Sequence, residues 1–514
     1  MTEKVIPIGI DLGTTFSVLA RLDDRGRPTT IVNAEGERIT PSVVLFDGQD
    51  VVVGREALKA IAQEGQRVAT CAKRDVGHPV FHKVLEGKQF PPEVIEAWVL
   101  NKLRLDAMQQ IGPFTKVVIT VPAYFDEVRR KATQDAGYMA GFEVLDIINE
   151  PTAAAVAFGY QCGFLDNEGQ SKTPEQILVY DLGGGTFDVT VMEIRDNRFT
   201  AMATDGDVQL GGYDWDQRLV DLVAEGFIRE HFVDPREDAS TLGRLWLECE
   251  DAKRTLSVRS KASIPCDYRG FSSRIEITRE QFEEATQDLL DRTRFTTVQT
   301  LKAAGLDWDK LDRVLLVGGS TRMPMVRAML QKVCGKEPDS SVAADEAVAH
   351  GAALHAGLIL ARDQGRPPLF KIKNVNSHSL GVVGMDPLTH RRRNGILIPR
   401  NTPLPVSAKR TFKTQKDNQH SILVQIVEGE SPSADDCNPL GKCSVRGLPH
   451  GMPARSPVDV LFHYETNGRL KVKVSVANTD REVETEIIRE NSLAKEHLDG
   501  WRRYIARMEP TEYR

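Results

Sequence analysis

The spacing of hydrophobic residues changes several times between residue 5 and about residue 360. Short apolar runs such as 116–123 and 143–149 have the length of buried strands, and each is followed by a segment with a helical period. The second of these helices is predicted to open at Glu150 and Pro151, because proline suits a first helical turn. This alternation is typical of an α/β fold. Further predicted elements are helices near 212–231 and 242–257, a hairpin near 261–278, one long helix over 279–304, and a strand at 313–320 that leads into a helix.

The pattern changes again after residue 361. Residues 362–376 are polar and contain a Pro-Pro break, which predicts an interdomain linker after a first domain at 1–361. Short strands separated by Gly, Asn and Pro turns follow over 377–490, and they predict an all-β sandwich domain. The remaining residues, 491–514, fit one short C-terminal helix that ends near Met508.

Composition narrows the class of protein. A chain of 514 residues with 41% hydrophobic residues can bury large cores. The net charge of −7, with acids and bases interspersed, gives no basic surface for a phosphate backbone, so we expect no nucleic-acid partner. The sequence has no N-terminal targeting segment and no apolar run of membrane-spanning length, and its seven cysteines stand singly. We therefore expect a cytoplasmic protein without a membrane partner.

Two segments, 8–22 and 180–194, share one scheme: an apolar strand, Asp-Leu-Gly, a turn of small residues and an outgoing strand. Glycine lets backbone N–H groups approach an anion with no Cβ in the way, so two such turns can hold the phosphates of a nucleotide between two lobes. The acids before the turns, Asp11 and Asp181, suit a hydrated divalent cation. Either turn alone fits an ordinary hairpin equally well, but the matching acids favour a nucleotide clamp. No P-loop motif GxxxxGK[ST] is present.

Several longer blocks resemble one family in order and approximate spacing. They are "GIDLGTTFS", "VPAYFDEVRRKATQDAG", "IINEPTAAAVAFGY", "VYDLGGGTFDVTV", "GDVQLGGYDWD", "ECEDAKRTLS", "VLLVGGSTRMPMV" and "DEAVAHGAA". These blocks resemble the ATPase domain of heat-shock protein 70 chaperones, and the later "SLGV", "NTPLP", "DNQHSILVQIVEGE" and "NGRLKVKV" resemble the peptide-binding β-sandwich of that family. The resemblance covers about residues 4–490. It implies a two-lobed, actin-like ATPase domain followed by a β-sandwich.

The resemblance also implies a nucleotide site for ATP or ADP with Mg²⁺. The implied catalytic residues are Lys73, Glu150, Asp181, Thr186 and Asp188, with Asp11 and Asp181 holding Mg²⁺ through water. The implied phosphate-binding residues are Asp11, Gly13, Thr14, Thr15, Phe16, Gly183, Gly184, Gly185, Thr186, Gly211 and Gly212. The implied residues around adenosine are Glu250, Lys253, Arg254 and Ser257 on one helix face, with Gly318, Gly319, Ser320, Arg322 and Asp345 opposite. The implied reaction is attack of water on the γ-phosphate, with Lys73 facing that phosphate and Glu150 or Asp188 near the water.

The family's sandwich holds an extended apolar peptide of an unfolded protein. The positions that match its pocket are Val382, Met385, Ile422 and Val424. The alternation of Ile422 and Val424 with polar residues is also what any sandwich core requires, and this second interpretation stays open. Burial of one leucine in such a pocket would contribute about 1.5 to 3 kcal/mol, so modest affinity is expected.

The chain departs from the family pattern at four places, three of which concern communication between the domains and partner proteins. The leucine-rich linker is replaced by Lys371, Ile372, Lys373 and Asn374, and such a charged linker is expected to dock poorly. Asp146 stands where an arginine serves J-domain co-chaperones, and the segment before 91 is short where nucleotide-exchange factors grip, so both partners are open questions. At most one helix of the family's lid is present, and rapid peptide escape is expected.

These departures lead to a hypothesis in which ATP is bound and hydrolysed while its control of peptide release is weakened. An ATP-dependent peptide chaperone is the leading prediction. An adaptor that binds a dedicated protein and uses ATP as a switch is the second, and a sugar-kinase-like or filament-forming ATPase is the third.

Overall fold

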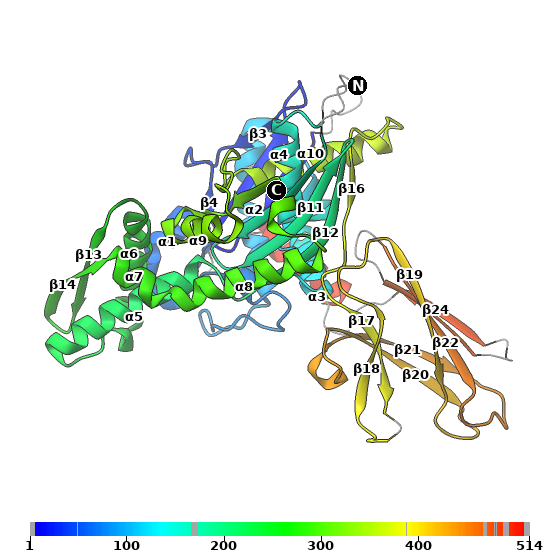
Figure 1. The fold of residues 1–514 in the computed structure, drawn as a ribbon. Helices are drawn as coiled ribbons and strands as arrows, with labels where there is room; N and C mark the ends of the chain where they lie inside the picture. The colour runs from blue at the N-terminus through cyan, green and yellow to red at the C-terminus, as the bar shows by residue number, and fades with distance from the viewer. Residues whose placement is uncertain are drawn as a thin grey trace.

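In a computed structural model of the chain, two α/β lobes share one cleft, and a β-sandwich lies beside them (Figure 1). The structure describes residues 6–507 except 49, 166–172, 387, 466–469, 477–478, 480 and 487–492. The predicted order of an α/β domain followed by an all-β domain is confirmed. No helix among the described residues is both long enough and apolar enough to cross a membrane.

The first lobe is built on a six-stranded sheet of order β3-β2-β1-β8-β9, with β4 paired to β2. One face of this sheet is covered by α2 and α3, because Ile8 and Ile10 of β1 point toward them and are fully buried. The strands are β1 (Ile8–Asp11), β2 (Phe16–Leu22), β3 (Pro28–Ile31), β4 (Thr40–Pro41), β8 (Lys116–Val121) and β9 (Glu143–Asn149), and the helices are α2 (Pro92–Ile111) and α3 (Glu127–Met139).

The second lobe repeats this plan with a five-stranded sheet of order β15-β10-β11-β12-β16. Its strand β10, between β15 and β11, is buried on both faces, since Leu178 and Tyr180 contact one core and Ile177 and Val179 another. The strands are β10 (Glu175–Leu182), β11 (Phe187–Arg195), β12 (Arg198–Asp207), β15 (Arg313–Val317) and β16 (Lys371–Lys373), and the helices are α5 (Gly212–His231), α6 (Ala239–Val258), α8 (Gln287–Ala303) and α9 (Pro324–Cys334).

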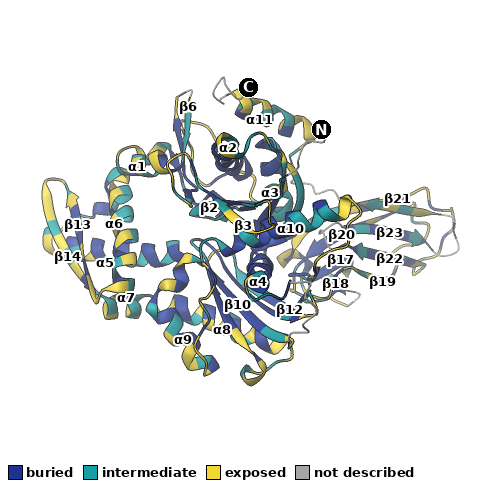
Figure 2. Ribbon diagram, turned by 90° about the horizontal axis from the view of Figure 1, so that it is seen from above, coloured by how far each residue is buried: buried dark blue, intermediate teal, exposed yellow. Residues whose placement is uncertain are grey.

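Two helices lie between the sheets, α4 (Glu150–Gln161) and α10 (Ala347–Asp363) (Figure 2). Their close packing depends on glycine. A Cβ on Gly9 of β1 would lie 2.1 Å from the Ala353 nitrogen of α10, and one on Gly351 would lie 1.8 Å from the Ala153 carbonyl oxygen of α4. The helix predicted to open at Glu150 does begin there.

Smaller elements extend both lobes on the side of the cleft. They are β5 (Val44–Asp47), β6 (Asp50–Val53), β7 (Val68–Ala69) and α1 (Arg55–Glu64) in the first lobe, and β13 (Lys261–Tyr268), β14 (Phe271–Thr278) and α7 (Arg279–Ala285) in the second. The predicted single helix over 279–304 is wrong, because α7 and α8 are separate. Thr286 breaks the helix with φ −117° and ψ 8°, and its hydroxyl donates a hydrogen bond to the Phe282 carbonyl at 2.8 Å.

The C-terminal domain is a sandwich of two four-stranded antiparallel sheets, β18-β17-β20-β21 and β19-β22-β23-β24. Alternate residues of each strand fill the core between the sheets, as period-two patterning requires. The strands are β17 (Leu380–Met385), β18 (Arg392–Ile398), β19 (Val406–Lys413), β20 (Ser421–Glu428), β21 (Asn438–Arg446), β22 (Pro457–Tyr464), β23 (Leu470–Val476) and β24 (Glu482–Glu486).

The linker between the domains forms a strand of the ATPase-like sheet. Strand β16 pairs in parallel with β12, in the register Phe199 to Ile372. The expectation that a charged linker docks poorly is therefore wrong. The pairing uses backbone groups, only Ile372 turns toward the core, and Lys371 and Lys373 keep their charges in solvent.

The C-terminal helix α11 (Lys495–Arg507) packs on the first lobe against α2 and α3 (Figure 2). Leu498 and Ile505 are buried there, and the rings of Trp501 and Phe90 lie 6.0 Å apart. The outer parts of the predicted helical tail, 491–492 and 508–514, lie outside the described residues.

Candidate functional site

A cavity of about 510 Å³ lies between the two lobes, at the ends of both glycine-turn hairpins. Residues of both lobes line it, as the predicted nucleotide clamp requires. The predicted site residues that line it are Asp11, Gly13, Thr14, Thr15, Phe16, Lys73, Glu150, Asp181, Gly183, Gly184, Thr186, Glu250, Lys253, Arg254, Ser257, Gly318, Gly319, Ser320, Arg322 and Asp345.

The two glycine turns approach each other closely. A Cβ on Gly184 would lie 2.2 Å from Thr15 Oγ1, and one on Gly185 would lie 2.3 Å from Thr14 Cγ2. Side chains at these glycines would therefore push the lobes apart. The absence of side chains at Gly183 and Gly184 leaves the backbone of the second turn at the cavity wall, where an anion can approach it closely.

Lys73 lies in a short 3₁₀ turn (Ala72–Arg74), and its ammonium donates to Glu150 Oε1 at 2.6 Å. Both side chains are buried, with exposed fractions of 3% and 9%. Burial acts to lower the pKa of Lys73, but the charges of Glu150 and Asp11 and the hydrogen bond outweigh it and raise this pKa above its ordinary value. Lys73 therefore stays a cation at the wall of the cavity.

Three buried carboxyl groups lie near this cation. Burial raises the pKa of Asp11 to about 7, of Asp188 to about 8, and of Asp181 well above its usual range, and the charge of Glu150 adds to each shift. Asp181 and Asp188 face each other across the β10–β11 pair. One lysine cannot balance so much negative charge, so the donor set fits a bound cation.

The way in which a cation could be held follows from the spacing of these acids. Among the residues that the structure describes, no three His, Cys, Asp or Glu side chains converge closely enough to ligate a metal ion directly. Asp11 and Asp181 both line the cavity, so the residues present fit a cation bound through water.

Four predicted site residues lie behind the cavity rather than in its wall. Asp188 is fully buried and accepts a hydrogen bond from the backbone N–H of Tyr124 at 2.9 Å. The other three are Gly185, Gly211 and Gly212, whose backbones support the second turn. The Gly212 N–H donates to the Gly183 carbonyl at 3.0 Å, and a Cβ on Gly211 would lie 2.4 Å from the Gly185 nitrogen. These contacts fix the turn that lines the cavity.

The opposite end of the cavity is formed by α6 and the loop after β15. Glu250, Lys253, Arg254 and Ser257 lie on one face of α6, as predicted from their spacing. Arg254 pairs with Glu250 at 2.5 Å. Across the cavity, Arg322 pairs with Asp345 at 2.6 Å. Two cationic groups therefore lie on opposite sides of this end of the cavity.

Sequence reasoning missed Asp216 and Tyr213 of α5. Asp216 pairs with Lys253 at 2.7 Å, and Lys253 also donates to the Gly212 carbonyl at 2.9 Å. The buried acid follows Gly212 by four residues, which was the available signal. The other missed residues are apolar, and nothing in their sequence context distinguishes them from core: Val18, Ile39, Val258, Val317, Met323, Ala344 and Val348.

The predicted peptide-pocket residues divide into two groups. Val382, Ile422 and Val424 are 4%, 8% and 4% exposed and belong to the sandwich core, whereas Met385 is 46% exposed. In this arrangement Ile422 and Val424 are core residues, the interpretation that the sequence had left open, and Val382 belongs to the core as well.

Asp146 lies in β9 and accepts a hydrogen bond from His355 of α10 at 2.8 Å. Its charge is therefore directed at a neighbouring helix of the same domain.

The fold and site define a class of protein: a two-lobed nucleotide-cleft ATPase joined to a β-sandwich. The chain matches the family model described as Hsp70 protein over residues 7–86 and 78–509. It is 40% identical over 522 residues to the chaperone protein DnaK of two strains of Thermus thermophilus, covering 96% of this chain and 82% of each relative. The chaperone protein DnaK of Deinococcus proteolyticus is 39% identical over 527 residues, covering 96% of this chain and 80% of the relative.

The chain belongs to the Hsp70 family. It is an ATPase and an ATP-dependent chaperone, as its resemblance to that family predicted.

Proposed function

We propose that the chaperone binds ATP in the cavity between the lobes and that Lys73 and Glu150 carry the hydrolytic step there. The buried Lys73–Glu150 pair at the cavity wall is the observation that carries this proposal. The Lys73 ammonium neutralises charge on the transferring phosphoryl group. Glu150 accepts a hydrogen bond from Lys73 through one oxygen, and its second oxygen is the group we assign to orienting the attacking water.

The remaining predicted site residues take supporting roles in this proposal. The glycine turns hold the phosphates, Thr186 contacts the γ-phosphate, and the α6 residues face Arg322 across the adenosine. Asp11 and Asp181 would hold Mg²⁺ through water, and the ion would supply positive charge beside the phosphates. Asp188 is held by the Tyr124 N–H and acts from behind the second turn.

For the sandwich, we propose that extended apolar segments of unfolded proteins bind at Val382, Met385, Ile422 and Val424. Support comes from the matching family positions and from the exposure of Met385. Because the other three side chains are buried, their surroundings must open before a peptide side chain can enter.

We further propose that the protein is cytoplasmic and that it binds J-domain and nucleotide-exchange partners. Asp146 and the short segment before residue 91 are the features that would change how those partners bind.

The variant Lys73→Ala tests the catalytic assignment. General acid–base and charge effects of this kind contribute about 10² to 10⁴-fold, so single-turnover ATP hydrolysis should fall by that factor while ATP binding persists. Lys116→Ala is the matched control, since Lys116 belongs to the same lobe and its 3.7 Å contact with Glu143 is at the surface. A melting curve with ATP separates lost catalysis from lost folding. A hydrolysis rate within about tenfold of the unmodified protein would contradict the assignment.

A further inference from the structure

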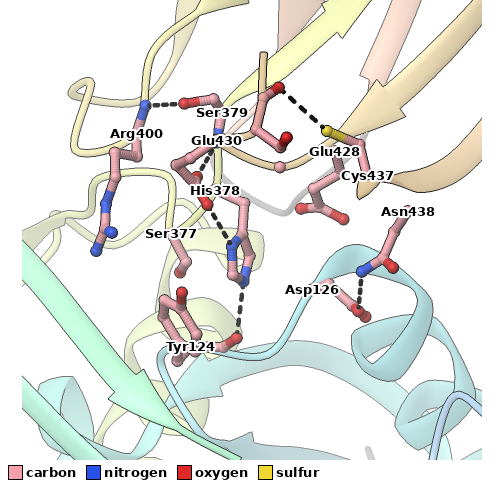
Figure 3. A network of polar contacts seen from close by, with 12 residues as sticks. Tyr124, Asp126, Ser377, His378, Ser379, Arg400, Glu428, Glu430, Cys437 and Asn438 are labelled. Carbon is pink, nitrogen blue, oxygen red and sulfur yellow. Dashed lines mark hydrogen bonds and ion pairs between the residues drawn. The ribbon is translucent and has the colours of Figure 1, made fainter. Parts of the chain in front are cut away.

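The sandwich meets the ATPase domain through a polar interface centred on residues 123–127 (Figure 3). Ser377 donates a hydrogen bond to the Ala123 carbonyl, and Asn438 donates to Asp126 at 3.3 Å. The buried Tyr464 hydroxyl donates to Glu127 at 2.8 Å. The interface therefore combines several hydrogen bonds and charges with an apolar contact of Val128 against the sandwich core.

His378 lies at the centre of this network, shortly after the linker strand. Its Nε2 atom is 3.0 Å from the Tyr124 carbonyl oxygen, and its Nδ1 atom is 3.9 Å from Glu430 Oε2 (Figure 3). The imidazole also packs on the Tyr124 ring, with centroids 4.4 Å apart, and only 14% of its side chain is exposed. The groups that face the two ring nitrogens are a carbonyl and a carboxylate, both acceptors. A neutral imidazole can donate to one of them, whereas an imidazolium donates toward both.

The charged groups around His378 come from every element packed against it. The buried Glu428 is the last residue of β20 and Glu430 follows it, and both contribute negative charge. On the other side, Arg400 lies over the Tyr124 ring and forms an ion pair with Asp205 of β12 at 3.0 Å. Glu430 is further held by the Ser379 N–H at 2.8 Å. The surroundings of the imidazole are thus net acidic, and the Ser379 N–H holds Glu430 beside the ring.

Tyr124 also connects this interface to the nucleotide site. Its N–H donates to Asp188 Oδ1 at 2.9 Å, while its carbonyl accepts the hydrogen bond from His378 at 3.0 Å. A single residue therefore separates the sandwich histidine from a carboxylate of the site.

We propose that His378 is a protonation-dependent latch, whose imidazolium form holds the sandwich docked on the ATPase domain and whose neutral form favours release. The proposal concerns the interface alone and stands whether or not the catalytic roles assigned to Lys73 and Glu150 are correct.

The direction of the pH effect follows from linkage. Burial acts to lower the pKa of His378, but the contacts with Glu430, Glu428 and the Tyr124 carbonyl outweigh it, and the docked pKa lies above the ordinary value of 6.5. When the sandwich is released, these contacts are lost. Protonation therefore stabilises docking fully below about pH 6.5, and this contribution disappears as the pH rises through the docked pKa.

Small-angle X-ray scattering of the full chain, with and without ATP, measures the docked fraction from about pH 6 to about pH 8.5. We expect the docking constant of the unmodified protein to fall about threefold or more over this range. His378→Gln keeps one donor for the Tyr124 carbonyl but cannot be protonated, so its docking constant should stay level. His355→Gln is the matched control, since His355 also pairs with a carboxylate but lies away from the interface; it should keep the unmodified profile.

Two results would overturn the proposal: a docked fraction of the unmodified chain that does not change with pH, or an unchanged pH profile in His378→Gln. Melting curves of each variant show whether it remains folded. As a second variant, Glu430→Gln should move the midpoint of the docking profile to lower pH, because the imidazolium loses an anionic neighbour.

Discussion

The close approach of the two glycine turns makes a sharp prediction for Gly184→Ala. The added Cβ would lie 2.2 Å from Thr15 Oγ1, 2.5 Å from Thr15 Cγ2 and 2.9 Å from Thr15 Cβ, all in the opposite lobe. Real Cβ atoms do not come this close to neighbouring atoms. Rotation of the Thr15 side chain moves its Oγ1 and Cγ2 but not its Cβ, so the contact between the new methyl group and the Thr15 Cβ remains. The lobes must therefore separate, which widens the gap between the two turns that we propose to hold the phosphates.

The size of the effect can be bounded. Overpacking by one methyl group costs about 1 to 3 kcal/mol. If this cost falls on the closed arrangement that binds nucleotide, ATP affinity should decrease by about 5- to 150-fold, since about 1.4 kcal/mol corresponds to a factor of ten. Each lobe folds around its own core, so the melting temperature of the nucleotide-free protein should change little.

A double-mutant cycle identifies the clash. ATP affinity, measured by calorimetry, is compared for the unmodified protein, Gly184→Ala, Thr15→Gly and the double variant. Because Thr15→Gly removes the atoms that the new methyl meets, the cost of Gly184→Ala should be much smaller in that background. An equal cost in both backgrounds would refute the idea that these two turns meet as opposing jaws.

Three further substitutions test the helix packing and the buried charge. Gly351→Ala places a Cβ 1.8 Å from the Ala153 carbonyl oxygen, so it should destabilise the fold by about 3 kcal/mol or more. Gly500→Ala is the control: its Cβ lies in open space on α11, so it should add up to about 1 kcal/mol of helix stability. Urea melts measure the free energy of unfolding of both variants. Burial raises the pKa of Glu96 from its ordinary value of 4.5 to about 7, so the buried acid lowers stability progressively as the pH rises from about 4.5 to 7 and by a constant amount above that. Glu96→Gln should therefore stabilise the protein by up to about 3 kcal/mol at pH 8 and much less near pH 5, and an equal gain at both pH values would contradict this.

Much of the fold could be predicted because local signals and tertiary structure agree. The run 143–149 and the helix beginning at Glu150 occur as β9 and α4, since an apolar strand length and an acid-proline helix start need no distant partner. The break at Thr286 was missed because a threonine within a helical period gives no stop signal. Its hydroxyl donates to the Phe282 carbonyl alongside its own backbone N–H, a contact that residue type alone does not reveal.

The wall of the proposed nucleotide site could be predicted from the sequence for a different reason. Asp11 and Asp181 occupy equivalent places in a repeated hairpin, so each supports the assignment of the other. Lys73 came only from the family resemblance, since its buried pairing with Glu150 joins residues that are 77 positions apart. The partition of the predicted glycines into those that line the cavity and those that support the turn, such as Gly211, could not be read from residue type.

The docking of the linker was predicted wrongly from the sequence, for a physical reason. The two lysines of the linker suggested a segment that avoids the ATPase domain, but strand pairing is made by backbone groups and leaves alternate side chains in solvent. The charged linker therefore docks by strand pairing, and the residues that follow it form a polar interface with the ATPase domain. Ser377 and His378 bring polar contacts to the ATPase domain at the point where Tyr124 meets Asp188. A polar junction is strong when every partner is satisfied and weak when one donor is lost, so a proton at His378 can control an interface that an apolar side chain there would hold at any pH.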